Sequence, residues 1–483
     1  MTDHDEKAKQ ILLKRDECNE RSRVRKNRIA RIVTVLVAVM LTAATAVTAV
    51  IASRGRRPQT PADVPGTVTR ADTVTGPYLD GVIGENKESE IGFSGGLKGE
   101  AYKSEAEVAE RSDSYSYYPK SGMPDMAYEP SANTPDAKAG TLTAGEWKDL
   151  AQFDQWLKKL GEDEFGAAAK NRKLDTSKMI RVKVTDEGAC FNVPVKLISG
   201  GETVFTARTD INGEAFLFTG LDGKDEKPDS VSVGDMTVAL DGRTELEINA
   251  KDAGVTAEKL DLMLMIDTTG SMGDELEYIK AELADLVSRV SEADKTFSIR
   301  VSVNFYRDEG DLYVVKYFDF RSDVNECLEL MKDEHADGGG DYPEAVHTAL
   351  ENAVTGHQWR DDAVKLCFFV LDAPPHTEND VQGINENILK SLRAAAALGV
   401  RIIPVASSGV DLETEVILRS FAVITGGTYI FITNDSGIGG DHKEAEVGEH
   451  VVESLNECMI RVACEYCGIY KGEKIPYTQT YHQ

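Results

Sequence analysis

Three short polar segments contain residue types whose spacing could bind a metal ion. The first is D-T-T-G-S, in which Asp267, Thr269 and Ser271 alternate, so that their oxygens can face one side of a loop. Asp341 follows three glycines, and Asp372 follows the apolar run VKLCFFVL. Three converging carboxylates are costly unless a cation neutralises them. Because all the donors are oxygens, the set favours a hard divalent ion, Mg²⁺ first, with Ca²⁺ or Mn²⁺ also suitable.

The elements around these segments alternate between buried strands and amphipathic helices from about residue 258. The expected strands are LDLMLMI, FSIRVSVNFY, VKLCFFVL, VRIIPVA and GTYIFI, and the expected helices cover 273–291, 323–331, 343–355, 384–398, 412–423 and 444–463. This pattern predicts an α/β fold with a doubly wound, mostly parallel sheet. YVVKYFDF follows its neighbour after a short turn, so we expect one antiparallel edge strand. Ligands of such sheets bind at the carboxyl ends of the strands, where all three segments lie.

D-T-T-G-S-M after an apolar strand, then G-G-G-D-Y-P-E-A, then F-F-V-L-D-A-P-P-H, resembles the von Willebrand factor A (vWA) domain with its metal-ion-dependent adhesion site. The resemblance covers about 258–465, and we place the domain at 258–468. A similar D-T-T-G-S-M with G-G-G-D occurs in the subgroup that includes domains attached to some alpha-kinases. The resemblance implies Asp267, Thr269, Ser271, Asp341 and Asp372 as the metal set.

Two positions depart from the usual pattern of that family. Thr269 replaces a serine and keeps a hydroxyl, whereas Asp341 stands where the family usually has a threonine. An added carboxylate lowers the net charge of the site, so we expect tighter retention of the cation and a weaker pull on an acidic partner group. If Asp341 points away from the site, it could instead cap the following helix.

Other polar residues near the same edge allow more than one interpretation. Arg307 and Asp308 end the second strand and could frame the site as an ion pair, or form a solvated turn. His376 follows the third motif and could support the site or face a partner, although a single loop histidine usually does neither. The glycine-rich loop 435–440 lacks the lysine of a phosphate-binding loop, so we interpret it as a connection.

Two further segments precede the α/β region. Residues 176–252 alternate apolar and polar residues between turn signals, which predicts an antiparallel β-sandwich that serves as a spacer. It resembles the immunoglobulin-like, transthyretin-like modules common on bacterial surface proteins, and Asp210 and Asn212 fit a turn better than a calcium site. In 141–175, Thr143 and Glu146 match a capping box before an amphipathic helix that extends to about Lys170.

The N-terminal part of the sequence has the pattern of a signal anchor. Ile32–Ser53 is 22 residues without a charge, with eight Lys or Arg residues before it and four after it within about 20 residues. We therefore expect a single-pass transmembrane helix at 32–53, a cytoplasmic basic tail at 1–31 and an extracellular body. A cleaved signal peptide is the alternative. Residues 54–140 read as a disordered stalk, and 469–483 as a tail.

Charge and cysteine content limit the classes of partner. The net charge is −28, and residues 1–31 carry ten Lys or Arg against six Asp or Glu, so the remainder is strongly acidic and nucleic acid is excluded as the main partner. Six of the seven cysteines would lie outside the cell, where disulfides can form. Cys464 and Cys467 form C-x-x-C without a second pair, so we expect buried thiols or a local disulfide.

These features together predict binding and not catalysis, because no general base or nucleophile stands beside the carboxylates. We expect a cell-surface protein, anchored in the cell membrane, whose divalent cation mediates adhesion or another interaction with a protein partner. One alternative is a component of envelope-complex assembly or stress response that docks through the same domain. Another, less favoured, is a metal-dependent hydrolase.

Overall fold

The computed structural model describes residues 137–186, 188–251, 256–293, 297–440, 442–470 and 473–474. All of them belong to one compact unit, Glu105–Gln483. The expected basic tail, the segment 32–53, nearly all of the stalk and residues 475–483 lie outside the described residues. Within the described ranges, no helix is long and apolar enough to cross a membrane.

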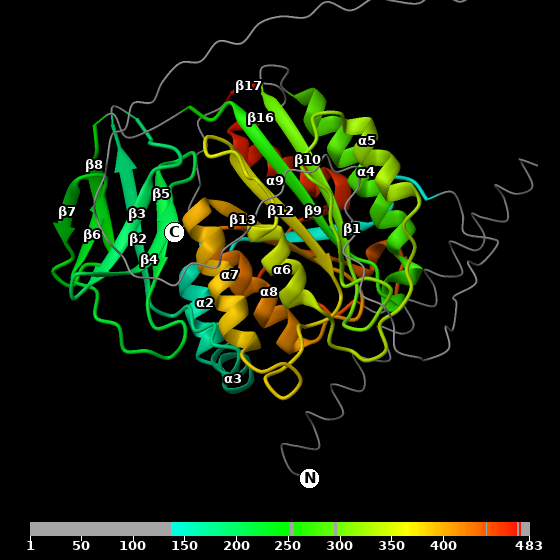
Figure 1. Ribbon diagram of the computed structural model, residues 1–483, viewed down its shortest axis with the longest axis horizontal. Coiled ribbons are helices and arrows are strands. Elements are labelled where there is room, and N and C mark those ends of the chain that lie inside the picture. The colour runs from blue at the N-terminus through cyan, green and yellow to red at the C-terminus, as the bar shows by residue number, and fades with distance from the viewer. Residues whose placement is uncertain are drawn as a thin grey trace, which may run out of the picture. The chain divides into compact units, whose positions relative to one another are not determined.

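The core of this unit is an eight-stranded sheet (Figure 1). Its strands, in spatial order, are β11 (Val315–Lys316), β10 (Ser298–Tyr306), β9 (Lys259–Asp267), β12 (Val364–Leu371), β13 (Val400–Ala406), β14 (Tyr429–Ile432), β1 (Thr143–Trp147) and β15 (Val452–Ser454). The strands from β10 to β14 pair in parallel, and β11 pairs antiparallel with β10. The expected mostly parallel α/β sheet with an antiparallel edge strand is confirmed.

Helices cover both faces of the sheet, which explains why its central strands are mostly apolar on both sides. One face packs against α4 (Leu276–Ala293), α5 (Val324–Lys332) and α9 (Leu455–Cys467), and the other against α6 (Val346–Thr355), α7 (Ile384–Leu398) and α8 (Leu412–Thr425). Along β9, Leu262 and Leu264 enter the first core, and Met263 and Met265 enter the second. This alternation is the period of two that a strand imposes on its side chains.

Most predicted helices are confirmed, with differences at two sites. The helix expected at 343–355 begins only at Val346, so Pro343 precedes it. The helix expected at 444–463 begins at Leu455, after the short strand β15, and continues to Cys467. Residues 444–451 are therefore irregular, and they lead the chain to the edge of the sheet.

The prediction of a helix from Thr143 was wrong for its first residues, because Thr143–Trp147 is strand β1. It pairs antiparallel with both β14 and β15. The capping-box side chains are used elsewhere: the Thr143 hydroxyl is 2.8 Å from the hydroxyl of Thr433, and Glu146 pairs with Arg461 at 2.7 Å. Two separate helices follow, α2 (Phe153–Leu160) and α3 (Asp163–Asn171).

Between α3 and β9 the chain forms two smaller sheets. One has the order β5 (Glu214–Phe218), β2 (Met179–Thr185), β8 (Glu245–Asn249), and the other β4 (Glu202–Arg208), β3 (Pro194–Ser199), β6 (Ser230–Val233), β7 (Met236–Ala239). The pairing is antiparallel as expected except between β2 and β8, which are parallel. The chain therefore leaves the large sheet after β1, forms this β-module and returns at β9.

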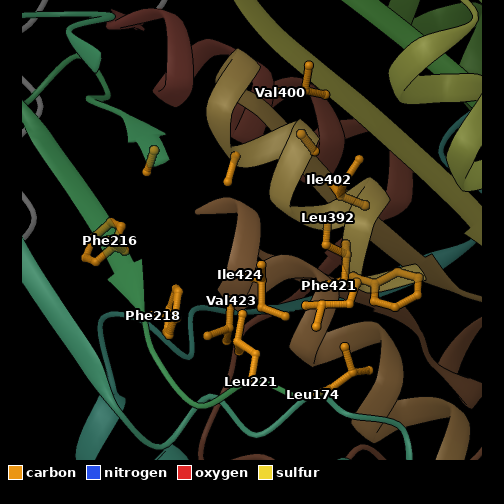
Figure 2. Close-up of a cluster of buried hydrophobic side chains, with 14 of the residues drawn as sticks. Leu174, Phe216, Phe218, Leu221, Leu392, Val400, Ile402, Phe421, Val423 and Ile424 are labelled. Atoms are coloured by element: carbon orange, nitrogen blue, oxygen red, sulfur yellow. The ribbon is translucent and has the colours of Figure 1, made fainter. Parts of the chain in front are cut away.

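The β-module packs on the α/β part and does not stand apart from it as the spacer interpretation implied. Phe216 and Phe218 of β5 belong to the same hydrophobic cluster as Val423 and Ile424 of α8 (Figure 2). Arginines from both parts also donate to backbone carbonyls across this contact. Arg401 donates to the Arg208 carbonyl at 2.8 Å, Arg208 donates to the Ala397 carbonyl at 3.0 Å, and Arg393 donates to the Val204 carbonyl.

Candidate functional site

The first loop of the site begins at the carboxyl end of β9 and holds Asp267 in a fixed orientation. One carboxylate oxygen, Oδ1, accepts hydrogen bonds from the Thr269 backbone N–H at 2.9 Å and from the Thr269 hydroxyl at 2.6 Å. The Thr269 hydroxyl is also 3.2 Å from that of Ser271. Asp267 is fully buried, yet its other oxygen, Oδ2, has no hydrogen-bond partner among the described residues. Because buried polar atoms usually have a partner, a bound ligand would explain this oxygen.

Asp372 lies at the same edge because β12, which it follows, is the parallel neighbour of β9. Its carboxylate is buried and accepts a hydrogen bond from Ser271, while Oδ1 is left without a partner in the described part of the chain. The structure therefore brings Asp267, Thr269, Ser271 and Asp372 together, as expected from the sequence.

Both carboxylates have raised pKa values. Burial raises the pKa of Asp267 to about 6. Burial and, second, the charge of Asp267 raise the pKa of Asp372 to about 8. The ionised form of each is thus disfavoured by low-dielectric surroundings, and that of Asp372 also by the charge of Asp267. A bound divalent cation would reverse both effects.

Asp341 does not join this pair in the same way. Its side chain is exposed at the tip of the second loop, where its charge contributes to raising the pKa of the neighbouring Asp308. The proposed alternative role as a helix cap is not observed, because α6 begins at Val346 with Ala345 as its N-cap and has no side-chain cap. The role of Asp341 as a metal ligand stays a prediction.

Glu344 is the acidic residue that the sequence interpretation missed. It is 3% exposed, and its Oε2 atom makes no hydrogen bond to any described residue. Burial, followed by the charges of Asp267, Asp308, Asp372 and Asp311 in that order, raises the pKa of Glu344 to about 10. It lies three residues after Asp341 and next to the apolar start of α6, which is the signal that could have marked it as buried.

Glycines let the second loop approach the first. Gly270 N–H donates to the Gly338 carbonyl at 3.2 Å, and Gly339 N–H donates to Asp311 Oδ2 at 2.7 Å. Gly338 has a φ of +78°, and a Cβ atom there would come within 2.3 Å of the Asp311 carboxylate. A larger residue at 338 would therefore clash with Asp311 and displace the loop that contains Gly338 and Gly339.

A buried polar network holds the first loop from behind. The Thr268 hydroxyl is 2.8 Å from that of Tyr313, which in turn donates to Glu334. Arg307 lies over the Tyr313 ring and pairs with Glu334 at 3.5 Å and Asp337 at 3.4 Å. These contacts fix the backbone on which Asp267 and Thr269 are presented.

Arg307 and Asp308 form neither the ion pair with each other nor the solvated turn that we had considered. Both are buried, and each has a different partner. Arg307 is directed to Glu334, and Asp308 pairs with His376 at 2.6 Å. The two residues follow the end of β10 at Tyr306, and their side chains have separate partners there. His376 thus supports the site by holding Asp308.

The donor set fits a hard cation with two carboxylate ligands. The described ranges contain no group of three or more His, Cys, Asp or Glu side chains placed to hold a metal ion. A site here would therefore rest on Asp267 and Asp372, with the hydroxyls of Thr269 and Ser271, and would leave positions for water or a partner. The partnerless oxygens of the two aspartates support this arrangement. Oxygen-only donors of this kind suit Mg²⁺.

Other motifs have structural roles. Asp210 accepts from the backbone of Asn212 and Glu214 at 2.8 and 2.9 Å, which confirms the turn interpretation. Cys464 and Cys467 are free thiols on α9, and no disulfide joins the described cysteines. Burial raises the pKa of both thiols, so they remain protonated at neutral pH.

Comparison with known proteins agrees with the fold. Residues 261–398, from β9 to α7, match the family model of the von Willebrand factor A domain, which supports a vWA domain in this part of the chain. A protein of Acanthamoeba polyphaga mimivirus described as an ariadne-like RING finger protein is 25% identical over 189 residues, which is 36% of this chain and 18% of that protein. An alpha-protein kinase of Dictyostelium discoideum is also 25% identical over 189 residues, 37% of this chain and 29% of the kinase. The chain thus covers less than a third of either relative's length.

Proposed function

We propose that this chain is a membrane-anchored surface protein whose vWA domain binds a divalent cation, Mg²⁺ in the first place, and uses it to bind a protein partner. The family match supports the protein-interaction part, since vWA domains commonly mediate such interactions. The cation, the membrane anchor, the adhesive role and the bacterial origin remain our proposals.

One observation carries the cation proposal. Asp267 Oδ2 and Asp372 Oδ1 are buried carboxylate oxygens at the ends of adjacent parallel strands, and neither has a hydrogen-bond partner in the described ranges. Leaving a buried carboxylate unpaired costs several kcal/mol, roughly, which a folded chain rarely tolerates without a compensating group. When bound, a cation would supply positive charge to both oxygens and an open coordination position to a partner.

The chain's own residues prepare that position. Thr269 holds Asp267 through two hydrogen bonds, so that only Oδ2 remains free to bind. Ser271 is exposed and links the first loop to Asp372, so its hydroxyl lies at the boundary between the site and solvent. A partner would therefore meet the centre through the loops at the carboxyl edge of the sheet.

Calorimetric titration of the purified full-length chain with MgCl₂ tests the cation. We expect the wild type to bind Mg²⁺ and Asp267→Ala not to bind it. Both proteins should be folded in the absence of metal. Asp341→Ala separates the sequence-based ligand set from the structure: retained binding would remove Asp341 from the ligands. If the wild type binds none of Mg²⁺, Ca²⁺ and Mn²⁺, the proposal is wrong.

The interaction is tested by affinity capture with the same three variants in Mg²⁺ and in EDTA. A partner retained only by the wild type, and only in Mg²⁺, would support cation-dependent binding. A partner retained equally in EDTA and by Asp267→Ala would show that binding does not use the centre. Hydrolysis of a generic phosphoester by the wild type but not by Asp267→Ala would replace this proposal with the hydrolase.

A further inference from the structure

We infer that Glu344, and not Asp341, is the added carboxylate that sets the charge of the cation centre. This inference rests on the proposed function, since it concerns how the same centre holds its cation. Glu344 would act beside the two aspartates, through its charge and an intervening water, because the described residues form no group of three carboxylates placed to hold an ion directly. The tighter retention of the cation, which we expected from Asp341 on the basis of the sequence, is then due to Glu344.

The backbone of Glu344 is hydrogen-bonded to the loop that follows β12 and contains Asp372. Its N–H donates to the Pro374 carbonyl at 2.9 Å, and Glu344 forms a parallel bridge with Pro375. Pro374 and Pro375 follow Asp372 and Ala373 directly, so Glu344 and Asp372 are held on two joined segments. The backbone at Glu344 therefore cannot move away from the loop of Asp372 without breaking this bridge.

The carboxylate of Glu344 and the first loop meet at Gly339. A Cβ atom built on Gly339 would lie 3.0 Å from Glu344 Oε1 and 3.4 Å from the Thr269 Cβ, so both side chains border this glycine. The glycine at 339 is what leaves space for them. The other oxygen of Glu344, Oε2, is buried and lacks a hydrogen-bond partner in the ranges that the structure describes.

Tyr306 lies close enough to Glu344 and to the two aspartates to feel the charge of all three. This side chain is fully buried at the end of β10, beside Asp267 in the register of the sheet. Burial comes first, and the charges of Asp267, Asp372 and Glu344 also help to place its pKa well above the ordinary value. Each of the three carboxylates has an oxygen without a partner among the described residues.

The basic side chains near the site that the structure describes have other partners. Arg307 binds Glu334, Asp337 and the His335 carbonyl, and His376 binds Asp308. The strongest influences on the ionisation of Glu344 are burial and four neighbouring aspartates, with no basic side chain among them. A divalent ion at Asp267 and Asp372 would supply positive charge to Glu344.

This charge has a consequence for recognition. Without metal, burial keeps Glu344 protonated at neutral pH, whereas a bound divalent ion favours its ionised form. With three ionised carboxylates and one divalent ion, the loaded centre then has a net charge of about −1, by simple addition of unit charges. A carboxylate of a partner would therefore be drawn to it weakly. The partner group that this centre accepts is a neutral or basic one.

The test is Mg²⁺ titration of the full-length chain as the wild type, Glu344→Gln and Asp341→Asn. The two substitutions remove the same charge from positions three residues apart, one buried and one exposed. We expect Glu344→Gln to weaken Mg²⁺ binding by about 10-fold or more, as loss of a second-layer metal partner does. Asp341→Asn should change it by less than about threefold, because exposed charges are screened.

Thermal unfolding in EDTA shows that the variant is folded and adds an independent readout. Glu344→Gln should unfold at the wild-type temperature or above it without metal, and should gain less stability from Mg²⁺. Unchanged Mg²⁺ affinity in Glu344→Gln, with binding lost in Asp267→Ala, would overturn this inference and leave the proposed function intact. A larger loss in Asp341→Asn than in Glu344→Gln would return the role to Asp341.

Discussion

Strand β9 carries two fully buried aspartates, one near each end, and the chain treats them in opposite ways. Asp261, near the amino end, accepts from Arg300 at 3.0 and 2.7 Å and from Arg360 at 2.7 and 2.8 Å. Asp267, at the carboxyl end, accepts from Thr269 on one oxygen, lies beside the Tyr306 phenol and forms no ion pair with a described residue. Strand β9 thus has a saturated end, where both oxygens of Asp261 accept hydrogen bonds, and an open end, where one oxygen of Asp267 has no hydrogen-bond partner among the described residues.

The contrast shows that the open carboxylate is specific to its position. Where Asp261 is buried for stability, two guanidinium groups and a backbone N–H neutralise it, which is the usual requirement for a buried charge. At the other end of the strand, Asp372 and Glu344 add further negative charge near Asp267. This is the arrangement of a binding edge, and it agrees with the general location of ligands in parallel sheets.

The largest effect is expected at the saturated end. Asp261→Asn should lower the free energy of unfolding by about 3–5 kcal/mol, because it breaks a fully buried carboxylate's pairing and leaves the partly buried Arg300 and Arg360 without a counterion. Urea denaturation in EDTA measures this change. Asp267→Asn is the matched substitution, six residues along the same strand, and should leave the metal-free stability equal or higher. Equal losses in the two variants would break the comparison.

The second effect is the stabilisation by Mg²⁺ itself. At 100 times its dissociation constant, a ligand that binds only the folded chain adds about 2.7 kcal/mol. We expect a gain of this size for the wild type in denaturation with Mg²⁺ at that excess. Asp267→Asn should show none of it. A gain that survives Asp267→Asn would place the ion somewhere else on the chain.

The stability of the metal-free protein should depend on pH because Asp267 and Asp372, at the open end of β9, have raised pKa values. Since the pKa values of Asp267 and Asp372 are raised to about 6 and about 8, the folded chain holds protons that the unfolded chain has already released. The stability that these protons provide is complete below about pH 4 and is lost as the pH rises to 8, on the order of several kcal/mol for the two aspartates together. Glu344, with its pKa raised to about 10, adds a slope of the same sign that the aspartate variants keep. Thermal unfolding in EDTA from pH 4.5 to 8 measures it. The Asp267→Asn, Asp372→Asn double variant should show a flatter profile, and an equal slope would contradict the assignment.

The parts of this structure that could be predicted are those set by nearby residues. Helix α7 has the predicted bounds because glycines in the left-handed conformation flank it, Gly383 with a φ of 80° and Gly399 with a φ of 77°. Strand β12 is buried at all eight positions and is apolar apart from Lys365. The sequence could place Asp267 and Asp372 at one edge because Asp267 ends β9 and Asp372 directly follows β12.

The missed parts depend on residues far away in the chain. Thr143–Trp147 matches a helix start locally, but it becomes a strand because Gly145 lies against the Phe431 side chain of β14, where a Cβ atom would come within 2.6 Å. Similarly, the sequence does not show which of Asp341 and Glu344 is buried. That choice depends on the bridge between Glu344 and Pro375, which joins two loops some thirty residues apart.

The smallest effect compares two exposed serines, one beside each aspartate. Ser271 donates to Asp372 at the open end, and the Ser298 hydroxyl accepts from Arg360 at 2.9 Å at the saturated end. Ser271→Ala removes a hydroxyl worth about 1 kcal/mol, so Mg²⁺ affinity should fall about fivefold. Ser298→Ala removes a similar hydroxyl and should leave Mg²⁺ affinity unchanged, and neither variant should shift the free energy of unfolding by more than about 1 kcal/mol. Titration of both variants with Mg²⁺ decides the point: if the two lose affinity equally, the loss reflects the whole domain and not the open end of β9.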